Sequence, residues 1–161
     1  MTDHEGGCLC GAVRYVAVAP PSRVTVCHCR FCQKATGAAY IVEPLFACAD
    51  IKTVSGEPRI YRHRSEGSGK IIEVNFCGAC GTKLFQTFER YPDLVGVFAG
   101  TFDDPNWFEV SARTSKHVFV GLGRRGTIIP AGFNVFEAHA VALDGSASTP
   151  VVFDKHHIIG S

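Results

Sequence analysis

The sequence lacks a strong excess of charge of either sign. Its sixteen Lys and Arg residues and fifteen Asp and Glu residues give a formal charge of +1 at pH 7. Proteins that bind nucleic acids or anionic membranes usually do so through an excess of positive charge, which this chain does not have. We therefore expect no nucleic-acid partner and no membrane partner, and the predicted partner is a small molecule.

The sequence also lacks the features of a targeting or membrane-spanning segment. Residues 1–7 are polar and do not form the basic start and apolar core of a secretory signal. No apolar run approaches the length that crosses a bilayer. We expect a cytoplasmic protein, in which cysteines stay as thiols unless a metal holds them. The clustered spacing of the eight cysteines then favours metal binding over a framework of disulfides.

Helical periodicity is almost absent, and the apolar residues alternate or occur in short runs bounded by Gly, Pro and Asp, which is typical of strands. The predicted strands cover residues 12–18, 38–42, 59–62, 70–76, 83–88 and 94–98. Turn residues at 55–58 separate two runs, and those at 66–69 separate the next two as in a hairpin, which suits antiparallel neighbours. One short helix is predicted after Cys29, ending at Gly37. The predicted fold class is mainly β, with several small antiparallel sheets and a short helix.

The length and the apolar content fit one ordinary domain. The chain has 161 residues, of which 46% are hydrophobic, enough for a sizeable core. We predict a single domain over residues 1–161. After Gly121 a basic, glycine-rich loop is followed by short apolar runs mixed with Gly, Pro and Ser, so residues 122–161 are expected to form a C-terminal extension.

Seven of the eight cysteines fall into three tight clusters. The clusters are Cys8 with Cys10, the triple Cys27, Cys29 and Cys32, and Cys77 with Cys80. The last pair encloses Gly78 and is followed by Gly81, and such glycines let backbone amides point at the sulfurs, as in a zinc knuckle. A thioredoxin-like redox pair has the same spacing but needs a helix to follow, whereas residues 82–88 alternate like a strand. Metal binding is therefore the prediction for this pair.

One knuckle supplies two of the four ligands of a structural zinc, so a second pair must come from elsewhere in the chain. Joining Cys8 and Cys10 to Cys77 and Cys80 leaves no pair unused and keeps the triple intact. Four thiolates form a closed tetrahedral site that stabilises a fold and does not react. We predict a structural zinc on these four cysteines.

The triple Cys27, Cys29 and Cys32 places three sulfurs within six residues, close enough to bind one ion. Three protein ligands leave a coordination position for water or substrate, so we predict an open second zinc site here, with the three cysteines as its catalytic ligands. Two other residues are alternatives for the fourth ligand. His28 is expected to support the ligands and Cys48 to be a small buried thiol. If either closed the site, the protein would be a non-catalytic scaffold with two structural zinc ions.

Three thiolates give the zinc complex a net negative charge, which makes it poorly suited to producing hydroxide. Such a soft site favours an incoming thiol, which it binds as a thiolate and presents to an electrophilic carbon. Candidates for gripping the carboxylates of a peptide thiol are Arg30, Lys34 and Arg59. His117, on a predicted strand, is a candidate to face the site or simply to make one hydrogen bond.

Residues 6–15, 27–37 and 76–82, which contain all seven clustered cysteines, resemble the glutathione-dependent formaldehyde-activating enzyme family, which also contains centromere-protein-V-like members. The resemblance implies a β-tent fold stabilised by two zinc ions, one on each of the two predicted cysteine groups. It further implies a carbon–sulfur lyase that reversibly joins glutathione and formaldehyde to S-(hydroxymethyl)glutathione at the three-cysteine zinc. The implied partners are a small thiol such as glutathione and a small aldehyde.

Overall fold

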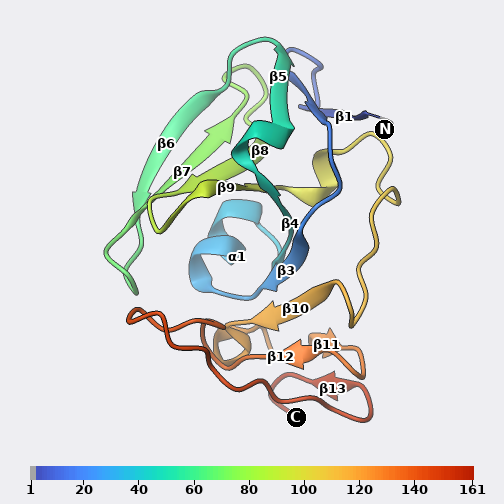
Figure 1. Cartoon of the computed structure of the whole chain (residues 1–161), viewed down its shortest axis with the longest axis vertical. Coiled ribbons are helices and arrows are strands. Elements are labelled where there is room, and N and C mark those ends of the chain that lie inside the picture. Colours follow the sequence, from blue (N-terminus) through green and yellow to red (C-terminus); the bar gives the residue numbers. More distant parts are fainter. Residues whose placement is uncertain (1–2) are drawn as a thin grey trace. The chain divides into compact units, whose positions relative to one another are not determined.

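The computed structural model describes residues 3–161 and confirms the mainly β prediction, with 40% of the residues in strands and 10% in helices (Figure 1). The chain divides into two compact units. Unit 1 contains the described residues up to Arg23 together with Glu43–Phe108, and unit 2 contains Val24–Val42 and Glu109–Ser161. The single domain over residues 1–161, with its extension at 122–161, stays a prediction.

A three-stranded antiparallel sheet in unit 1 contains β1 (His4–Gly7), β2 (Arg14–Ala17) and β5 (Ile51–Ser55) in the order β1-β2-β5. Side chains along β2 alternate in burial, which turns Tyr15 into the core. A Cβ at Gly6 would overlap the ring of Tyr15, so the glycine lets this ring pack directly against β1.

The larger set of unit 1 strands follows the order β4-β9-β8-β7-β6, and the neighbouring pairs are antiparallel. The bounds are Ile41–Ala47 for β4, Arg59–Arg64 for β6, Ile71–Phe76 for β7, Lys83–Phe88 for β8 and Tyr91–Val97 for β9. Short 3-10 turns cover Cys48–Asp50 and Ala99–Thr101. The hairpin predicted around residues 66–69 is confirmed, with Gly69 in the left-handed region at φ 68°.

The core of unit 1 includes two of the clustered cysteines. Its buried members are Cys8, Val13, Tyr15, Ala17, Phe46, Cys77, Leu84, Val95, Val97 and Phe102. Tyr15 also forms a hydrogen bond between its hydroxyl and that of Thr101 at 2.7 Å, which satisfies its buried polar atom. Because Cys8 and Cys77 belong to this cluster, apolar packing holds the two segments that carry them, which are far apart in the sequence.

Unit 2 contains a parallel arrangement in the order β12-β10-β3. These strands are β3 (Arg23–Cys27), β10 (Ser115–Val118) and β12 (Asn134–Val135), and a separate antiparallel pair joins β11 (Ile128–Ile129) to β13 (His157–Ile158). The expectation of antiparallel neighbours is therefore wrong for β10. Parallel strands are not joined by tight turns, so the turn residues that predict hairpins carry no information about these pairs.

Helix α1 (Arg30–Thr36) confirms the predicted helix and its end at Gly37. Gly37 has a φ of 70° and its amide donates to the carbonyl of Gln33 at 2.9 Å, which satisfies the last turn. Cys29 is the N-cap, and its Sγ accepts a hydrogen bond from the amide of Cys32. A 3-10 turn, Val120–Leu122, follows β10 in the same unit.

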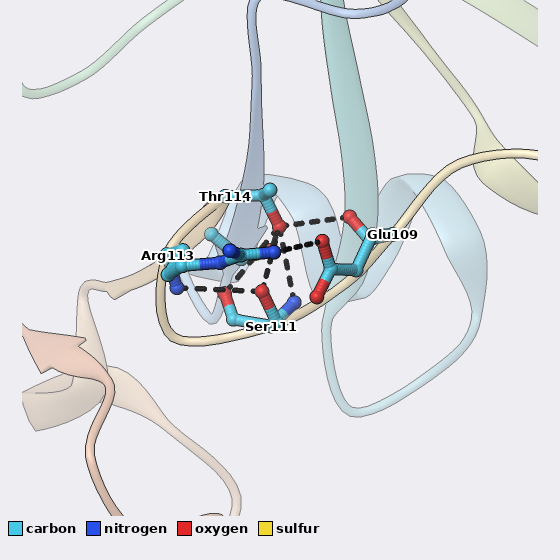
Figure 2. Close-up of polar contacts among 5 residues, drawn as sticks. Glu109, Ser111, Arg113 and Thr114 are labelled. Carbon is cyan, nitrogen blue, oxygen red and sulfur yellow. Dashed lines mark hydrogen bonds and ion pairs between the residues drawn. The ribbon is translucent and has the colours of Figure 1, made fainter.

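The turn that leads into β10 is fixed by its own polar side chains (Figure 2). The hydroxyl of Thr114 donates to the carbonyl of Glu109 at 2.9 Å and accepts from the amide of Ser111 at 3.1 Å. Arg113 forms an ion pair with the Glu109 carboxylate at 3.1 Å. These bonds set the start of β10, the strand that carries His117.

A second apolar cluster lies in unit 2 and is built mainly by the C-terminal part of the chain. Its buried residues are Val120, Ile129, Phe133, Val135 and Ile159, with Phe153 packed against them. Residues 122–161 therefore have apolar packing of their own, although their strands are only two residues long. Within residues 3–161, no helix is long and apolar enough to cross a membrane.

Candidate metal centres

The structure brings together the sulfurs of Cys8, Cys10, Cys77 and Cys80, all within 4.8 Å of one another. The Sγ of Cys10 lies 3.6 Å from that of Cys8 and 3.8 Å from that of Cys77. Four sulfurs around a tetrahedral zinc, each with a bond of about 2.3 Å, are about 3.8 Å apart. The spacing in unit 1 therefore fits four thiolates on one zinc ion.

The two cysteine pairs of this group lie in two similar turns. The amide of Gly11 donates to the carbonyl of Cys8 at 3.0 Å, and the amide of Gly81 donates to the carbonyl of Cys77 at 2.9 Å. Both glycines have a φ of 75°, a left-handed conformation that glycine adopts without steric cost. In each turn the first cysteine is buried and the second is exposed.

The groups around these four sulfurs shift the pKa values of the thiols in different directions. The hydroxyl of Thr82 lies 3.1 Å from the Sγ of Cys80, and this bond together with the Thr82 amide lowers the pKa of Cys80 to about 5. The amide of Ala12 lowers the pKa of Cys10, but the neighbouring Cys80 and Cys8 sulfurs oppose it and raise that pKa to about 11. Four adjacent thiolates therefore need a cation to balance their charge.

The sulfurs of Cys27, Cys29 and Cys32 also lie within 4.8 Å of one another, in unit 2. Strand β3 ends at Cys27 and α1 begins at Arg30. The sharp junction between strand and helix brings the three sulfurs close together. Hydrogen bonds from Cys27 and Cys32 lower the pKa of Cys29 to about 3. The pKa values of Cys27 and Cys32 rise, chiefly because each donates to a neighbouring sulfur. A divalent cation would be needed to hold all three as thiolates.

The group of three found among residues 3–161 contains no further Cys, His, Asp or Glu ligand atom. Cys48 belongs to unit 1, where it begins a 3-10 turn and its thiol donates to the carbonyl of Pro92 at 3.5 Å. The prediction of a small buried thiol is wrong, because Cys48 is exposed after the end of β4.

The ring of His28 makes its hydrogen bond with another histidine. Its Nε2 lies 3.0 Å from the Nδ1 of His117, and both side chains are buried. Burial lowers the pKa of each ring to about 4. The pair is therefore neutral at neutral pH, and each histidine has a partner other than the sulfurs.

The three candidate cations for substrate carboxylates do not share one unit. Arg59 lies in unit 1, where a Cβ at Gly78 would lie 2.7 Å from its Nε, so this side chain covers the turn of the four-cysteine group. Arg30 and Lys34 lie on α1 of unit 2 and are exposed, and Arg30 donates to the Oε1 of Gln33. Sequence reasoning missed Thr82 and Gln33, polar residues that stand close to clustered cysteines.

These features define a class of cysteine-rich β proteins with one group of four sulfurs and one group of three. A family model described as glutathione-dependent formaldehyde-activating enzyme matches residues 3–121. The chain belongs to this family, as the three cysteine-bearing segments predicted.

Known relatives extend over most of the chain. A Halomonas elongata protein named "Putative glutathione-dependent formaldehyde-activating enzyme" is 31% identical, with 73% of this chain and 87% of that protein aligned. An uncharacterised lyase of Schizosaccharomyces pombe is 28% identical over 53% of this chain and 58% of its own length. A crystal structure of a Rhodobacter sphaeroides protein has a TM-score of 0.50 and 21% identity, covering 68% of this chain and 92% of that one. This last likeness concerns the fold alone.

Proposed function

We propose that the protein is a zinc-dependent enzyme of the carbon–sulfur lyase type, which adds glutathione or a similar thiol to formaldehyde or a related small aldehyde. The observation that carries the proposal is the difference between a group of four sulfurs and a group of three among residues 3–161. Membership of the family and the names of two relatives, one a formaldehyde-activating enzyme and one a lyase, support it.

Each cysteine group has a distinct proposed role. Cys8, Cys10, Cys77 and Cys80 would hold a structural zinc, and Cys27, Cys29 and Cys32 would hold a second zinc. When bound, the second zinc supplies a Lewis acid with a free coordination position, which lowers the pKa of a thiol that reaches it.

The proposed reaction needs no oxidant or reductant. The thiol loses its proton, a sulfur–carbon bond forms at the aldehyde carbon, and the carbonyl oxygen gains a proton to become the hydroxyl of the product. In the reverse direction the sulfur–carbon bond breaks and the aldehyde is released.

The exposure and charge of residues in unit 2 support this proposal. Cys27 and Cys32 are buried, whereas Cys29 is only half-buried, so a small thiol can approach the group from the Cys29 side. Arg30 directly follows Cys29, and Lys34 lies one turn further along α1. Both are exposed cations that would attract the carboxylates of a peptide thiol such as glutathione.

The variant Cys29→Ser tests the proposal. Serine is a good N-cap, so α1 and the fold are expected to persist, while the second zinc equivalent and the activity are lost. Zinc stoichiometry and NMR of exchange in a glutathione and formaldehyde mixture measure the two effects. Cys48→Ser, which changes an exposed cysteine outside both groups, is the matched control and should keep both zinc ions.

Unchanged turnover in a Cys29→Ser protein that has lost one zinc would contradict the enzyme proposal. X-ray absorption at the zinc edge, measured with and without glutathione, adds a second criterion. Glutathione should add a sulfur ligand at the three-cysteine group. A fourth protein ligand that glutathione does not displace would instead favour a zinc-stabilised scaffold.

A further inference from the structure

His28, the residue between Cys27 and Cys29, is held at three of its polar groups. Its side chain is 0% exposed. The amide donates to the carbonyl of Val118 at 3.0 Å, and the carbonyl accepts from the Nε2 of Gln33 at 2.6 Å. The ring Nε2 meets the Nδ1 of His117 at 3.0 Å. Since the ring Nδ1 is buried without a partner in the described chain, His117 is the polar anchor of this ring.

Gln33 follows Cys32 and uses both ends of its amide. The Nε2 donates to the carbonyl of Leu122 at 2.9 Å as well as to that of His28, and the Oε1 accepts from Arg30. The side chain is 9% exposed. Gln33 therefore ties the peptide between His28 and Cys29 to the segment that follows β10, and it does so with its polar atoms satisfied.

His117 is held both by β3 and by residues beyond the family match, which ends at 121. On β10, His117 is paired with Val26 of β3 on one side and with Val135 of β12 on the other. The ring of Phe133 packs edge-on against the imidazole, with 5.2 Å between the ring centroids. Strand β3 and the C-terminal segment together fix the position of the nitrogen that bonds to His28.

We propose that His117 and Gln33 are positioning residues of the three-cysteine site. By holding the ring and the carbonyl of His28, they keep the chain between Cys27 and Cys29 in the conformation that brings the two sulfurs together. The ordering is then complete before a metal binds, which raises the affinity of the site. This inference deepens the proposed function and rests on metal binding by the three cysteines.

Cobalt titration of the full chain separates positioning from mere packing. Cobalt bound by thiolates absorbs visible light, and Cys29→Ser gives the spectrum of the four-cysteine group alone. His117→Leu fills the buried position with an apolar side chain but loses the bond to His28, and Gln33→Met keeps the length of the side chain but loses both donors. Each variant is expected to weaken cobalt binding at the three-cysteine site about 10- to 100-fold, as for other residues that orient metal ligands.

The matched control is His117→Asn. An asparagine side chain places a polar atom on Cγ, where His117 carries Nδ1, so it can restore the bond to His28 and most of the affinity. The four-cysteine group serves as an internal control, because its cobalt spectrum and affinity should be the same in all the variants. A changed spectrum at that group would reveal a general loss of fold.

Two failures can be told apart. If the wild-type chain binds no more cobalt than Cys29→Ser does, the proposed function is wrong, since the three-cysteine group then holds no metal. If the wild type binds two equivalents and folded His117→Leu and Gln33→Met bind the second as tightly, the positioning inference is overturned. Should His117→Leu fail to fold, the comparison of Gln33→Met with the wild type decides.

Discussion

The two cysteine groups reach a similar spacing of sulfurs by different routes. In unit 1 the sulfurs come from two turns, and Cys10 and Cys77 lie 67 residues apart in the sequence, whereas in unit 2 the sulfurs lie within six residues at one strand-to-helix junction. A metal that joins distant segments contributes directly to folding, because the unfolded chain cannot form its site. A local group needs less of the fold to bring its sulfurs together, so we expect its metal to contribute less to stability. We therefore predict that loss of metal destabilises the protein more at the four-cysteine group than at the three-cysteine group.

Removal of a buried cysteine from the four-cysteine group of unit 1 should have the largest effect. Cys77→Ser should lose one zinc and lower the free energy of unfolding by more than about 4 kcal/mol, the range typical of a lost metal site. Cys77 is 1% exposed and lies in the core cluster, so the effect includes lost packing. Urea denaturation in the presence of zinc measures it. Equal stability of Cys77→Ser and Cys29→Ser would contradict the distinction between the groups.

Core substitutions compare the two units and test the predicted single domain. Leu84 in unit 1 and Ile129 in unit 2 are both 0% exposed. Substitution of either by alanine should cost about 2–5 kcal/mol through lost burial and a cavity. The cobalt bands of the two groups serve as local probes during urea denaturation. A single domain predicts that both bands disappear together in each variant, and separate transitions would show that the units unfold independently.

The smallest expected effect concerns the glycine that closes each cysteine turn. Gly81→Ala should cost about 1–2 kcal/mol, because the added Cβ meets nothing within 4 Å but the φ of 75° is unfavourable for alanine. Gly11→Ala should cost a similar amount, since its φ and its surroundings are the same. Gly100→Ala is the control, as its Cβ also meets nothing and its backbone is not left-handed. Thermal unfolding of zinc-loaded protein measures all three, and equal melting temperatures would contradict the backbone argument.

Much of unit 1 could be predicted because its signals are local. The strand at Lys83–Phe88 has the predicted bounds, and the hairpin around Gly69 follows from its turn residues. Helix α1 could also be predicted from local sequence, because Gly37 is a typical residue to end a helix. Where alternation, turn residues and caps agree, the local sequence is sufficient to define an element.

The parallel pairing in unit 2 could not be predicted in this way. Val26 and His117 face each other across β3 and β10 although they are far apart in the sequence. No turn residue records such a pairing, and β12 is too short to show a pattern of alternation. These contacts are set by tertiary packing, which the sequence periodicity does not encode.

In the candidate site, too, local sequence patterns could be predicted and long-range contacts could not. Cysteine spacing identified both groups of sulfurs, because cysteines that cluster in a chain of this type have few other uses. Gln33 and Thr82 were missed, since a glutamine or a threonine is common in any sequence, and one bond of Gln33 goes to the distant Leu122. Cys48 was predicted to be buried from its apolar neighbours, but the end of β4 at Ala47 leaves it on the surface.

The alternation of burial in the two turns of unit 1 has a consequence for metal exchange. Cys8 and Cys77 are buried, whereas Cys10 and Cys80 are exposed. An incoming chelator or metal-transfer protein can therefore reach Cys10 and Cys80 while the other two sulfurs stay in the core. For a zinc ion held by these four sulfurs, we expect exchange to begin at the two exposed sulfurs, without unfolding of the unit.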